Sequence, residues 1–439
     1  MNILILSPYP PYPPYGGGTM RIYQIIRGLS ARHAVTCLTF APDAAAEQAM
    51  QPLREHCRLL TVRGPEPRSM LRRAWTTLAS PLPDMALRNA SPAYAAALQA
   101  LLARESFDIV QAESIEMAGY LTMDNRRWTT VRETFAKNKG QGTKNKVFIH
   151  NAKLVLDQFN AEFVLQKRAA QASMRALRSS TRTPQAAARA GAAAVYSLMQ
   201  WLKLARYEQR AMQACDGVVA VSEDDRRTLQ ALAPAARIGV VPNGVDTAEF
   251  SRAALSGGPL SFRSPALVFT GTLDFRPNID AALYFAHEVL PRIRAHRPDA
   301  RFIIVGKRPA PAIQVLSSDG ATVVIGEVPD ARPYIAGATV YVVPMRIGGG
   351  VRLKLLEALA LEAPVVSTSM GAEGVLGLQD GEHCLLADQP EHFAAAVLRL
   401  LDDRELARWL GAAGCALVQA HYDWTTIVPR LEALYDEIT

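Results

Sequence analysis

The segment IGGGVRLKLLEALA, which begins at Ile347, places glycines, two cations and one carboxylate around the start of a helix predicted over 351–362. Unpaired N–H groups at a helix N-terminus attract anions, and glycines ahead of the helix let an anion come close to them. Arg352 and Lys354 add positive charge there, and the Glu357 carboxylate, one turn beyond Lys354, can accept hydrogen bonds from vicinal hydroxyls. An anion site beside a hydroxyl acceptor is typical of a site for a nucleoside diphosphate and its ribose.

The same segment also fits a structural interpretation, in which a glycine turn precedes a packing helix and Lys354 and Glu357 form an ordinary i,i+3 pair worth about 0.2–0.5 kcal/mol. A second glycine-rich turn, in SPYPPYPPYGGGTMR over 7–21, favours the binding interpretation. It follows the first predicted strand, where a doubly wound domain usually contacts phosphate. It lacks the GxGxxG pattern, however, and equally fits a stiff, proline-rich loop. Two such turns, one in each half of the chain, could face a common cleft.

Short apolar runs alternate with helical stretches through both halves of the chain. The predicted strands cover 2–7, 33–40, 107–113, 153–159 and 216–223 in the first half, and 266–273, 301–306, 322–328, 339–344 and 364–369 in the second. Continuous Val, Ile and Leu runs between helices indicate parallel sheets covered on both faces. We therefore predict two doubly wound α/β domains, with a shared ligand in the cleft between them, at the carboxyl ends of the strands.

The predicted domains cover 1–250 and 266–420, and a linker rich in Ser, Gly, Pro and Arg joins them over 251–265. A return helix over 421–439 is expected to cross back to the first domain. The lysine- and asparagine-rich stretch within 124–153 breaks the α/β pattern and is predicted to be an inserted loop. A phosphate-binding arm is the alternative interpretation of that stretch.

The net charge of +7 predicts an anionic partner, for which nucleic acid, a membrane surface and a phosphorylated substrate are candidates. One basic stretch fits either an anionic lipid surface or a solvated helix face. It consists of Lys167, Arg168, Arg175, Arg178 and Arg182.

Five scattered cysteines without a CxxC pair favour free thiols in a reducing compartment over a disulfide framework or a zinc site. The start, MNILILSP, lacks the features of a signal peptide, and no stretch reaches the roughly 18 apolar residues of a membrane span. We therefore expect a cytoplasmic location, with attachment to the inner face of the membrane as a further option.

Several motifs in a fixed order give the chain a resemblance to a known family. They are VVPNGVDTAEF (240–250), FTGTLDFRPNID (269–280), RFIIVG (301–306), GEV (326–328) and GGGVRLKLLEALALEAPVVSTSMGAEG (348–374). RYEQRAMQACDGVVAVSEDD (206–225) precedes them. With these motifs the chain resembles the family 4 retaining glycosyltransferases of the GT-B fold, also called glycosyl transferases group 1. The resemblance covers nearly the whole chain apart from the lysine-rich stretch.

The resemblance implies an enzyme that moves a sugar from a nucleoside diphosphate donor to a glycan or lipid-linked acceptor, with retention, in cell-surface polysaccharide or glycolipid synthesis. It implies no metal, no cofactor and no nucleic acid. Glu357 would hold the ribose hydroxyls, with Lys354 and Arg352 as the catalytic cations. The implied donor-binding positions are Gly17, Gly18, Gly271, Thr272, Glu327, Val328, Gly348, Gly349, Gly350 and Val351.

Two positions depart from the family pattern. Gly349 stands where the first of two motif glutamates is usual, and Thr272 stands where a basic residue usually follows the glycine. Arg352 and Lys354 are the natural replacements for the missing charge, and Arg276 is a weaker candidate. A catalytically inactive GT-B protein that binds a sugar nucleotide, or acts as a scaffold, is therefore an alternative.

On the acceptor side, Glu113, Asn160 and Glu162 follow predicted strands and resemble acceptor-contacting positions. Caps and turns use the same residue types, so a structural role is equally consistent. A nucleotide-dependent oxidoreductase on similar domains is a further alternative, but it is disfavoured because neither glycine turn has a GxGxxG pattern followed by an acid about twenty residues later.

Overall fold

The computed structural model describes residues 1–14, 16–121, 152–179, 184–348 and 350–439. Gly349 and nearly all of the predicted inserted loop lie outside these residues. The chain divides into two compact units. Unit 1 comprises Met1–Val241 and Val428–Thr439, and unit 2 comprises Pro242–Ile427. The units divide after Val241, so the stretch predicted as a linker, 251–265, lies within unit 2.

Unit 1 contains a parallel sheet whose seven described strands have the order β3-β2-β1-β4-β5-β6-β7. The strands are β1 (Asn2–Ser7), β2 (Ala34–Ala41), β3 (Arg58–Arg63), β4 (Ile109–Glu113), β5 (Lys153–Gln158), β6 (Gly217–Ala220) and β7 (Ile238–Val240). The central strands β1 and β4 are almost wholly buried, which explains their uninterrupted apolar runs. The edge strand β3 was not predicted, because its sequence RLLTVR begins and ends with arginine.

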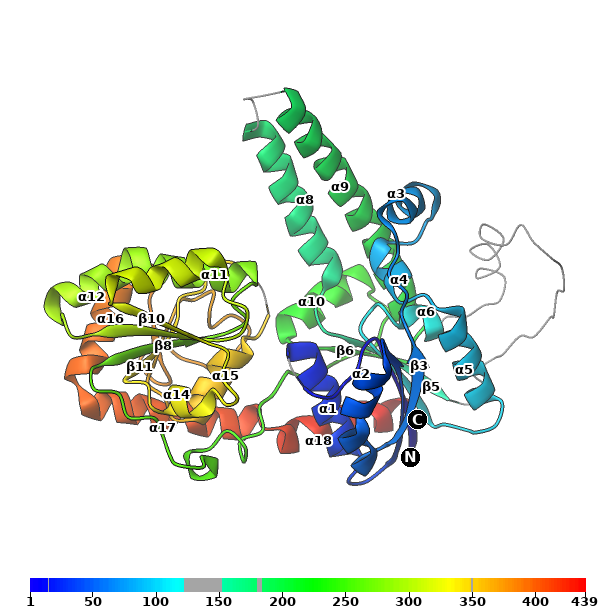
Figure 1. Cartoon of the computed structure of the whole chain (residues 1–439). Helices are drawn as coiled ribbons and strands as arrows, with labels where there is room; N and C mark the ends of the chain where they lie inside the picture. Colours follow the sequence, from blue (N-terminus) through cyan, green and yellow to red (C-terminus); the bar gives the residue numbers. More distant parts are fainter. Residues whose placement is uncertain (15, 122–151, 180–183, 349) are drawn as a thin grey trace. The chain divides into compact units, whose positions relative to one another are not determined.

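The helices of unit 1 include a long hairpin. They are α1 (Gly17–Leu29), α2 (Ala44–Ala49), α3 (Met70–Ala79), α4 (Asp84–Arg88), α5 (Pro92–Leu102), α6 (Ala118–Leu121), α8 (Glu162–Ser179), α9 (Pro184–Gln213) and α10 (Glu223–Leu232), with a short 3₁₀ helix at Gln51–Glu55. Helices α8 and α9 run side by side and extend away from the sheet of this unit (Figure 1).

The last helix, α18 (Trp424–Ile438), begins in unit 2 and ends in unit 1, which confirms the predicted return to the first domain. Glycines make room for its second half. A Cβ on Gly28 of α1 would lie 2.5 Å from Val428 Cγ2, and one on Gly217 of β6 would lie 3.3 Å from Ile438 Cδ1. The return helix therefore packs closely against both α1 and the sheet.

Unit 2 contains a second parallel sheet, with the order β10-β9-β8-β11-β12-β13 among its described strands. They are β8 (Ala266–Thr270), β9 (Arg301–Val305), β10 (Thr322–Gly326), β11 (Val340–Val343), β12 (Val365–Ser367) and β13 (Leu385–Leu386). The strand order reverses between β8 and β11, and ligands of such sheets bind where the order reverses. The loops that follow these two strands contain Gly271 and Gly348. Two parallel, doubly wound domains were predicted, and the structure confirms them.

The helices of unit 2 are α11 (Arg276–Tyr284), α12 (Leu290–His296), α13 (Pro311–Gln314), α14 (Arg332–Ala336), α15 (Leu353–Ala360), α16 (Pro390–Asp402) and α17 (Arg404–His421), with 3₁₀ helices at Arg252–Ala254 and Val315–Asp319. A π-helical turn at Phe285–Val289 separates α11 from α12. Pro291, near the start of α12, has no N–H to donate to the preceding turn, which accounts for the altered bonding there.

Candidate active site

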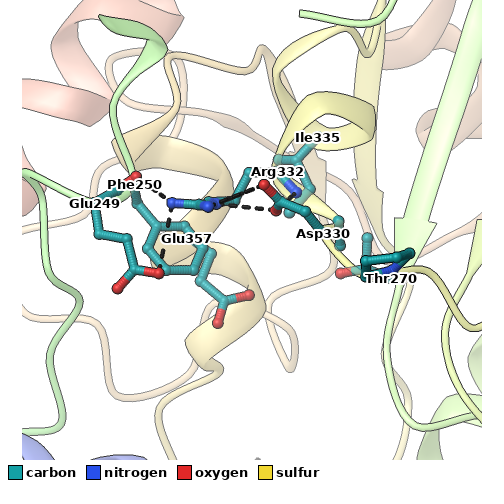
Figure 2. A pocket seen from close by; sticks show the side chains of 9 residues that line it. Glu249, Phe250, Thr270, Asp330, Arg332, Ile335 and Glu357 are labelled. Carbon is teal, nitrogen blue, oxygen red and sulfur yellow. Dashed lines mark hydrogen bonds and ion pairs between the residues drawn. The ribbon is translucent and has the colours of Figure 1, made fainter. Parts of the chain in front are cut away.

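Unit 2 contains a pocket of about 260 Å³ beside the end of β8 (Figure 2). It is lined by Glu249, Phe250, Thr270, Pro329, Asp330, Ala331, Arg332, Ile335 and Glu357. Thr270 is the last residue of β8, and Glu357 comes from α15. The pocket thus lies at the carboxyl end of a central strand and includes the carboxylate that the sequence predicted to be functional.

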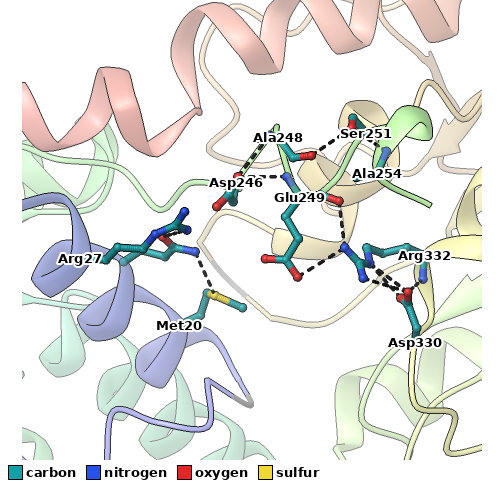
Figure 3. Close-up of polar contacts among 10 residues, drawn as sticks. Met20, Arg27, Asp246, Ala248, Glu249, Ser251, Ala254, Asp330 and Arg332 are labelled. Carbon is teal, nitrogen blue, oxygen red and sulfur yellow. Dashed lines mark hydrogen bonds and ion pairs between the residues drawn. The ribbon is translucent and has the colours of Figure 1, made fainter. Parts of the chain in front are cut away.

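Arg332 fixes one wall of this pocket (Figure 3). Its Nε and Nη2 atoms donate to the two carboxylate oxygens of Asp330, each at 2.9 Å. Its Nη1 atom donates to the carbonyl oxygen of Glu249 at 2.9 Å, and its guanidinium lies 5.9 Å from the ring centroid of Phe250. Burial raises the pKa of Asp330, but the bonds from Arg332 outweigh it and hold that pKa below its usual value. Arg332 therefore joins the chain around 249 to the start of α14.

The Glu357 side chain lines the pocket from α15 (Figure 2). Burial raises the pKa of this carboxyl to about 7, against the opposing effect of Lys354 and with a further increase from Glu249. The carboxyl is therefore close to the midpoint between its neutral and ionised forms at neutral pH. A ligand that donates hydrogen bonds to it would favour the ionised form.

Lys354 occupies a narrow position next to the loop after β8. Its Nζ donates to Asn278 Oδ1 at 2.8 Å and lies 4.1 Å from the ring centroid of Phe269. A Cβ on Gly271 would lie 2.8 Å from the same Nζ and 2.8 Å from Asn278 Nδ2, so the glycine lets both side chains come close to the loop. Burial lowers the pKa of Lys354 to about 7. The structure thus brings Lys354 to the loop where the usual basic residue is replaced by Thr272.

Asn278, in the first turn of α11, has a role that sequence reasoning missed. Its Nδ2 donates to the carbonyl oxygen of Thr272 at 2.8 Å while its Oδ1 accepts from Lys354. The side chain is 7% exposed and ties the loop after β8 to the lysine. A signal was available, because Asn278 lies in the segment FRPNID a few residues after Gly271.

Arg352 precedes α15 instead of lying within it. The helix was predicted from 351 but begins at Leu353, with Arg352 in an extended conformation as N-cap and no side chain capping the first turn. The Arg352 guanidinium folds back over Gly348. Its Nη2 atom would lie only 2.7 Å from a Cβ added to Gly348. Burial lowers the pKa of Arg352, against an opposing effect of Glu373.

The loop before α15 brings together the predicted glycines. Gly348 and Gly350 have positive φ angles of 128° and 76°, which other residues rarely adopt. Val351 packs close to Gly374, where a Cβ would lie 3.2 Å from Val351 Cγ2. The helix begins three residues after Gly350, so its first N–H groups do not adjoin the glycines as closely as predicted.

Glu327 and Val328 are two of the implied donor-binding positions, and the pocket is lined by the residues that follow them. Glu327 is exposed, and Val328 packs against the hydrophobic core of unit 2. Pro329 and Asp330 line the pocket in their place, because β10 ends at Gly326 and the chain turns before α14.

In unit 1, Gly17 is the first residue of α1. Gly16, its N-cap, has a φ of 123°. A Cβ on Gly18 would clash with the hydroxyl of Tyr9 and lie 3.3 Å from Phe159 Cε2. Gly18 thus has a packing role in addition to the predicted donor-binding role.

Glu113 is fully buried, although the sequence placed its carboxylate on the ligand side. Its Oε1 accepts from Gln111 Nε2 at 2.7 Å, and Gln111 in turn accepts from the Tyr435 hydroxyl of α18 at 2.6 Å. Arg21 of α1 donates twice to the neighbouring Asp157, at 2.9 and 3.1 Å. Burial, with the charge of Asp157, raises the pKa of Glu113 to about 8. The carboxylates at the ends of β4 and β5 thus belong to a buried polar network.

The other acceptor-side candidates lie at the start of α8. Asn160 Nδ2 donates to Glu162 Oε1 at 3.2 Å, and both residues are partly buried. The carboxylate of Glu208, from α9, accepts from the backbone N–H groups of Glu162 at 3.1 Å and Phe163 at 2.9 Å. Glu208 therefore caps α8, and Asn160 and Glu162 stay close together beside this cap.

The five cysteines are all unpaired thiols. Among the residues that the structure describes, no group of three or more His, Cys, Asp or Glu side chains could hold a metal ion. In that same part of the chain, no helix combines the length and the apolar character needed to cross a membrane.

Comparison with known proteins gives two family matches. Residues 264–403 match the family model of glycosyl transferases group 1, and residues 190–249 match that of glycosyltransferase family 4. The chain is 31% identical over 231 residues to a phosphatidyl-myo-inositol mannosyltransferase of Mycolicibacterium smegmatis, which covers 51% of this chain and 58% of that protein.

A second relative is a GDP-mannose-dependent alpha-(1-6)-phosphatidylinositol monomannoside mannosyltransferase of Mycobacterium tuberculosis, 31% identical over 237 residues. The match covers 49% of this chain and 60% of that protein. This chain thus spans less than two thirds of the length of either relative.

The fold resembles that of solved glycosyltransferases. Sucrose-phosphate synthase from Thermosynechococcus elongatus superposes with a TM-score of 0.64 and 18% identity, covering 100% of this chain and 99% of that one. The two parallel, doubly wound units therefore define a protein of the GT-B class. Residues 190–249 and 264–403 are thus similar to the glycosyltransferases of family 4 and of group 1, respectively.

Proposed function

We propose that this protein transfers a sugar from a nucleoside diphosphate donor to a glycan or lipid-linked acceptor, with retention of anomeric configuration, in the synthesis of a cell-surface polysaccharide or glycolipid. The observation that carries the proposal is the convergence in unit 2 of a partly buried cation and a carboxylate of the same helix. Lys354 lies against Gly271, and Glu357 lines the adjacent pocket. The mannosyltransferase names of the two relatives support this class of reaction.

Each group in this site has a role in donor binding. Glu357, once ionised, accepts hydrogen bonds from the ribose hydroxyls. Lys354 and Arg352 neutralise the diphosphate, and charge-assisted hydrogen bonds of this kind are roughly twice as strong as neutral ones. Backbone N–H groups near Gly350 and Thr272 complete the phosphate site.

In the proposed reaction the bond between the anomeric carbon and the leaving phosphate oxygen breaks. The acceptor hydroxyl oxygen forms a new bond to that carbon on the same face, and its proton passes to the departing phosphate. Negative charge therefore develops on the phosphate, where Lys354 and Arg352 stabilise it most. We propose that these cations make a metal ion unnecessary, so that an excess of EDTA should leave the transfer rate unchanged.

The test of this proposal is donor turnover. The purified chain is incubated with GDP-mannose, the donor named for one relative, or with UDP-glucose, together with an extract of membrane lipids as acceptor. We expect release of one nucleoside diphosphate that depends on the extract, and a product with the anomeric configuration of the donor sugar. Binding of the donor without any release would instead favour a non-catalytic sugar-nucleotide-binding protein, which the glycine at position 349 also suggests.

A further inference from the structure

The hairpin of α8 and α9 is firmly attached to unit 1 at its base and along one side. Glu208 caps the first turn of α8. Lys203 of α9 donates to the carbonyl oxygen of Ser80 at 2.7 Å and also to that of Thr77, at the end of α3. Gln200 accepts from the backbone N–H of Asp84 at 2.8 Å. Helices α3, α8 and α9 thus form one surface, which we call the hairpin surface.

Large apolar side chains are exposed on the three helices of the hairpin surface, with Leu165 and Met174 on opposite sides of α8 because they are nine residues apart. Within the described residues they are Trp75 of α3 (50% exposed), Leu165 and Met174 of α8 (37% each), and Val195 (62%), Tyr196 (40%), Leu198 (37%) and Leu202 (44%) of α9. Val195, Leu198 and Leu202 have the spacing i, i+3, i+7, which places them on one face of α9. Leu204 is buried on the opposite side of the helix, and Ala194 is buried at the edge of the stripe. The exposed face of α9 is therefore a continuous apolar stripe.

The same segment contains the whole positive excess of the protein. Residues 163–207 include eight cations and no Asp or Glu, a charge of +8, whereas the entire chain carries +7. The rest of the chain therefore has a net charge of −1. The cations are Lys167, Arg168, Arg175, Arg178, Arg182, Arg189, Lys203 and Arg206. Such a concentration of one sign makes a strong local field and selects an anionic partner.

Only one class of partner matches both properties. A second copy of the hairpin would bring two segments of charge +8 together without a carboxylate between them. A nucleic acid would neutralise the charge but would leave the stripe of Val195, Leu198 and Leu202 exposed. An anionic bilayer offers negative headgroups and, just beneath them, hydrocarbon. Trp75 and Tyr196 belong to the residue types that favour the interface between the two.

We propose that the hairpin surface docks on an anionic lipid bilayer, with the apolar stripe of α9 and Trp75 at the level of the headgroups and the arginines around them. The basic stretch alone fits either an anionic lipid surface or a solvated helix face. The exposed apolar stripe favours the lipid surface. The inference goes beyond the proposed transfer reaction, because vesicle binding needs neither a donor nor turnover. It would stand if the chain proved catalytically inactive.

The first test is co-sedimentation of the full chain with vesicles of phosphatidylcholine, alone or mixed with phosphatidylglycerol, at low and high salt. We expect binding only to the anionic vesicles, weakened by salt. Replacing the exposed Arg168, Arg175 and Arg189 by Gln should lower the affinity roughly a hundredfold, because each cation near such a surface contributes about a fivefold factor. The matched control replaces the exposed Arg263, Arg404 and Arg408 of unit 2 by Gln, and should change the affinity less than twofold.

The second test concerns penetration. Brominated lipids quench tryptophans that reach the acyl chains, so quenching should be largely lost in Trp75→Phe and kept in Trp409→Phe, which alters an equally exposed tryptophan of unit 2. Val195→Ser/Leu198→Ser/Leu202→Ser should keep its thermal unfolding but lose tight binding. Several results would overturn the proposal. They are no sedimentation at low salt, equal losses in the control variants, or a dimer in sedimentation equilibrium that the serine variant dissociates.

Discussion

Lys354 owes its position to two neighbours, of which Asn278 accepts from its ammonium and Gly271 leaves space for it. The ammonium is therefore kept next to the loop after β8 even though burial disfavours its charge. A lysine held in this way changes protonation near neutral pH, and a bound diphosphate would restore its charge. The hydrogen bond from Lys354 to Asn278 and the lowered pKa of Lys354 can each be tested by substitution.

Asn278→Ala should remove the acceptor of the Lys354 ammonium and leave that group unsatisfied, at a cost of about 1–3 kcal/mol. We expect lower stability in chemical unfolding and weaker binding of the nucleoside diphosphate in calorimetry. Asn278→Asp is the matched variant, because like alanine it loses the bond to the Thr272 carbonyl oxygen, but its carboxylate still accepts from Lys354, raises the pKa of the lysine and should retain the binding. Equal behaviour of the two variants would show that Asn278 does not position the lysine.

Lys354→Met should stabilise the ligand-free protein in a pH-dependent way. The pKa of Lys354 is lowered from 10.5 to about 7 in the folded chain, so the buried ammonium destabilises the fold fully below pH 7, and this cost is lost as the pH rises toward 10.5. The variant should therefore gain roughly 2–4 kcal/mol at pH 6–7 and little at pH 10, while losing nucleotide binding. Melting curves across this pH range would measure the difference, and a gain that does not depend on pH would contradict it.

At the scale of elements, close packing of α18 on α1 decides whether the C-terminal helix can return to unit 1. Gly28 lies in the last turn of α1, and an alanine there would normally favour the helix by about 0.5–1 kcal/mol. Its Cβ would lie 2.5 Å from Val428 Cγ2, however, and overpacking of this kind costs about 1–3 kcal/mol. The clash should outweigh the gain in helix propensity.

Gly28→Ala should therefore destabilise the protein, and Gly28→Ala combined with Val428→Ala should be more stable than Val428→Ala alone. The reversal of sign follows because the second change removes the methyl groups at 2.5 and 3.2 Å. The contact that remains, with the Cβ of residue 428 at 3.2 Å, needs only a small shift, so the helix propensity of alanine outweighs it. Urea unfolding of the four proteins in the cycle measures the coupling. A destabilising effect of Gly28→Ala in both backgrounds would mean that α18 does not pack there as described.

At the same scale, the sequence predicted strands better than helix boundaries. Apolar runs such as VYVV of β11 are buried on both faces, so their composition alone identifies them. The start of α15 at Leu353 depends on Arg352 folding back over Gly348, which no local pattern reveals. Helix α9 was not predicted, although its many alanines favour a helix.

For the whole molecule, two parallel sheets and a returning C-terminal helix could be predicted because strand and helix patterns alternate with regular spacing. The network of Glu113, Asp157 and Arg21 could not be predicted, because it depends on which side chains from distant segments face the same side of the sheet. The position of Asn278 beside Lys354 was missed for the same reason. Residue types at strand ends thus indicated where to look, but not which of them face a ligand.

The most direct test of the central claim, a nucleoside diphosphate site in unit 2 that uses Glu357, is a thermal-shift screen with UDP, GDP, ADP, their common sugars and NAD. A ligand at a hundred times its Kd stabilises the folded state by about 2.7 kcal/mol, which moves the melting temperature visibly. We predict a shift with one nucleoside diphosphate that disappears in Glu357→Ala and persists in Glu405→Ala, which alters an exposed carboxylate of the same unit. A shift with NAD alone, or no shift with any member of the panel, would contradict the account.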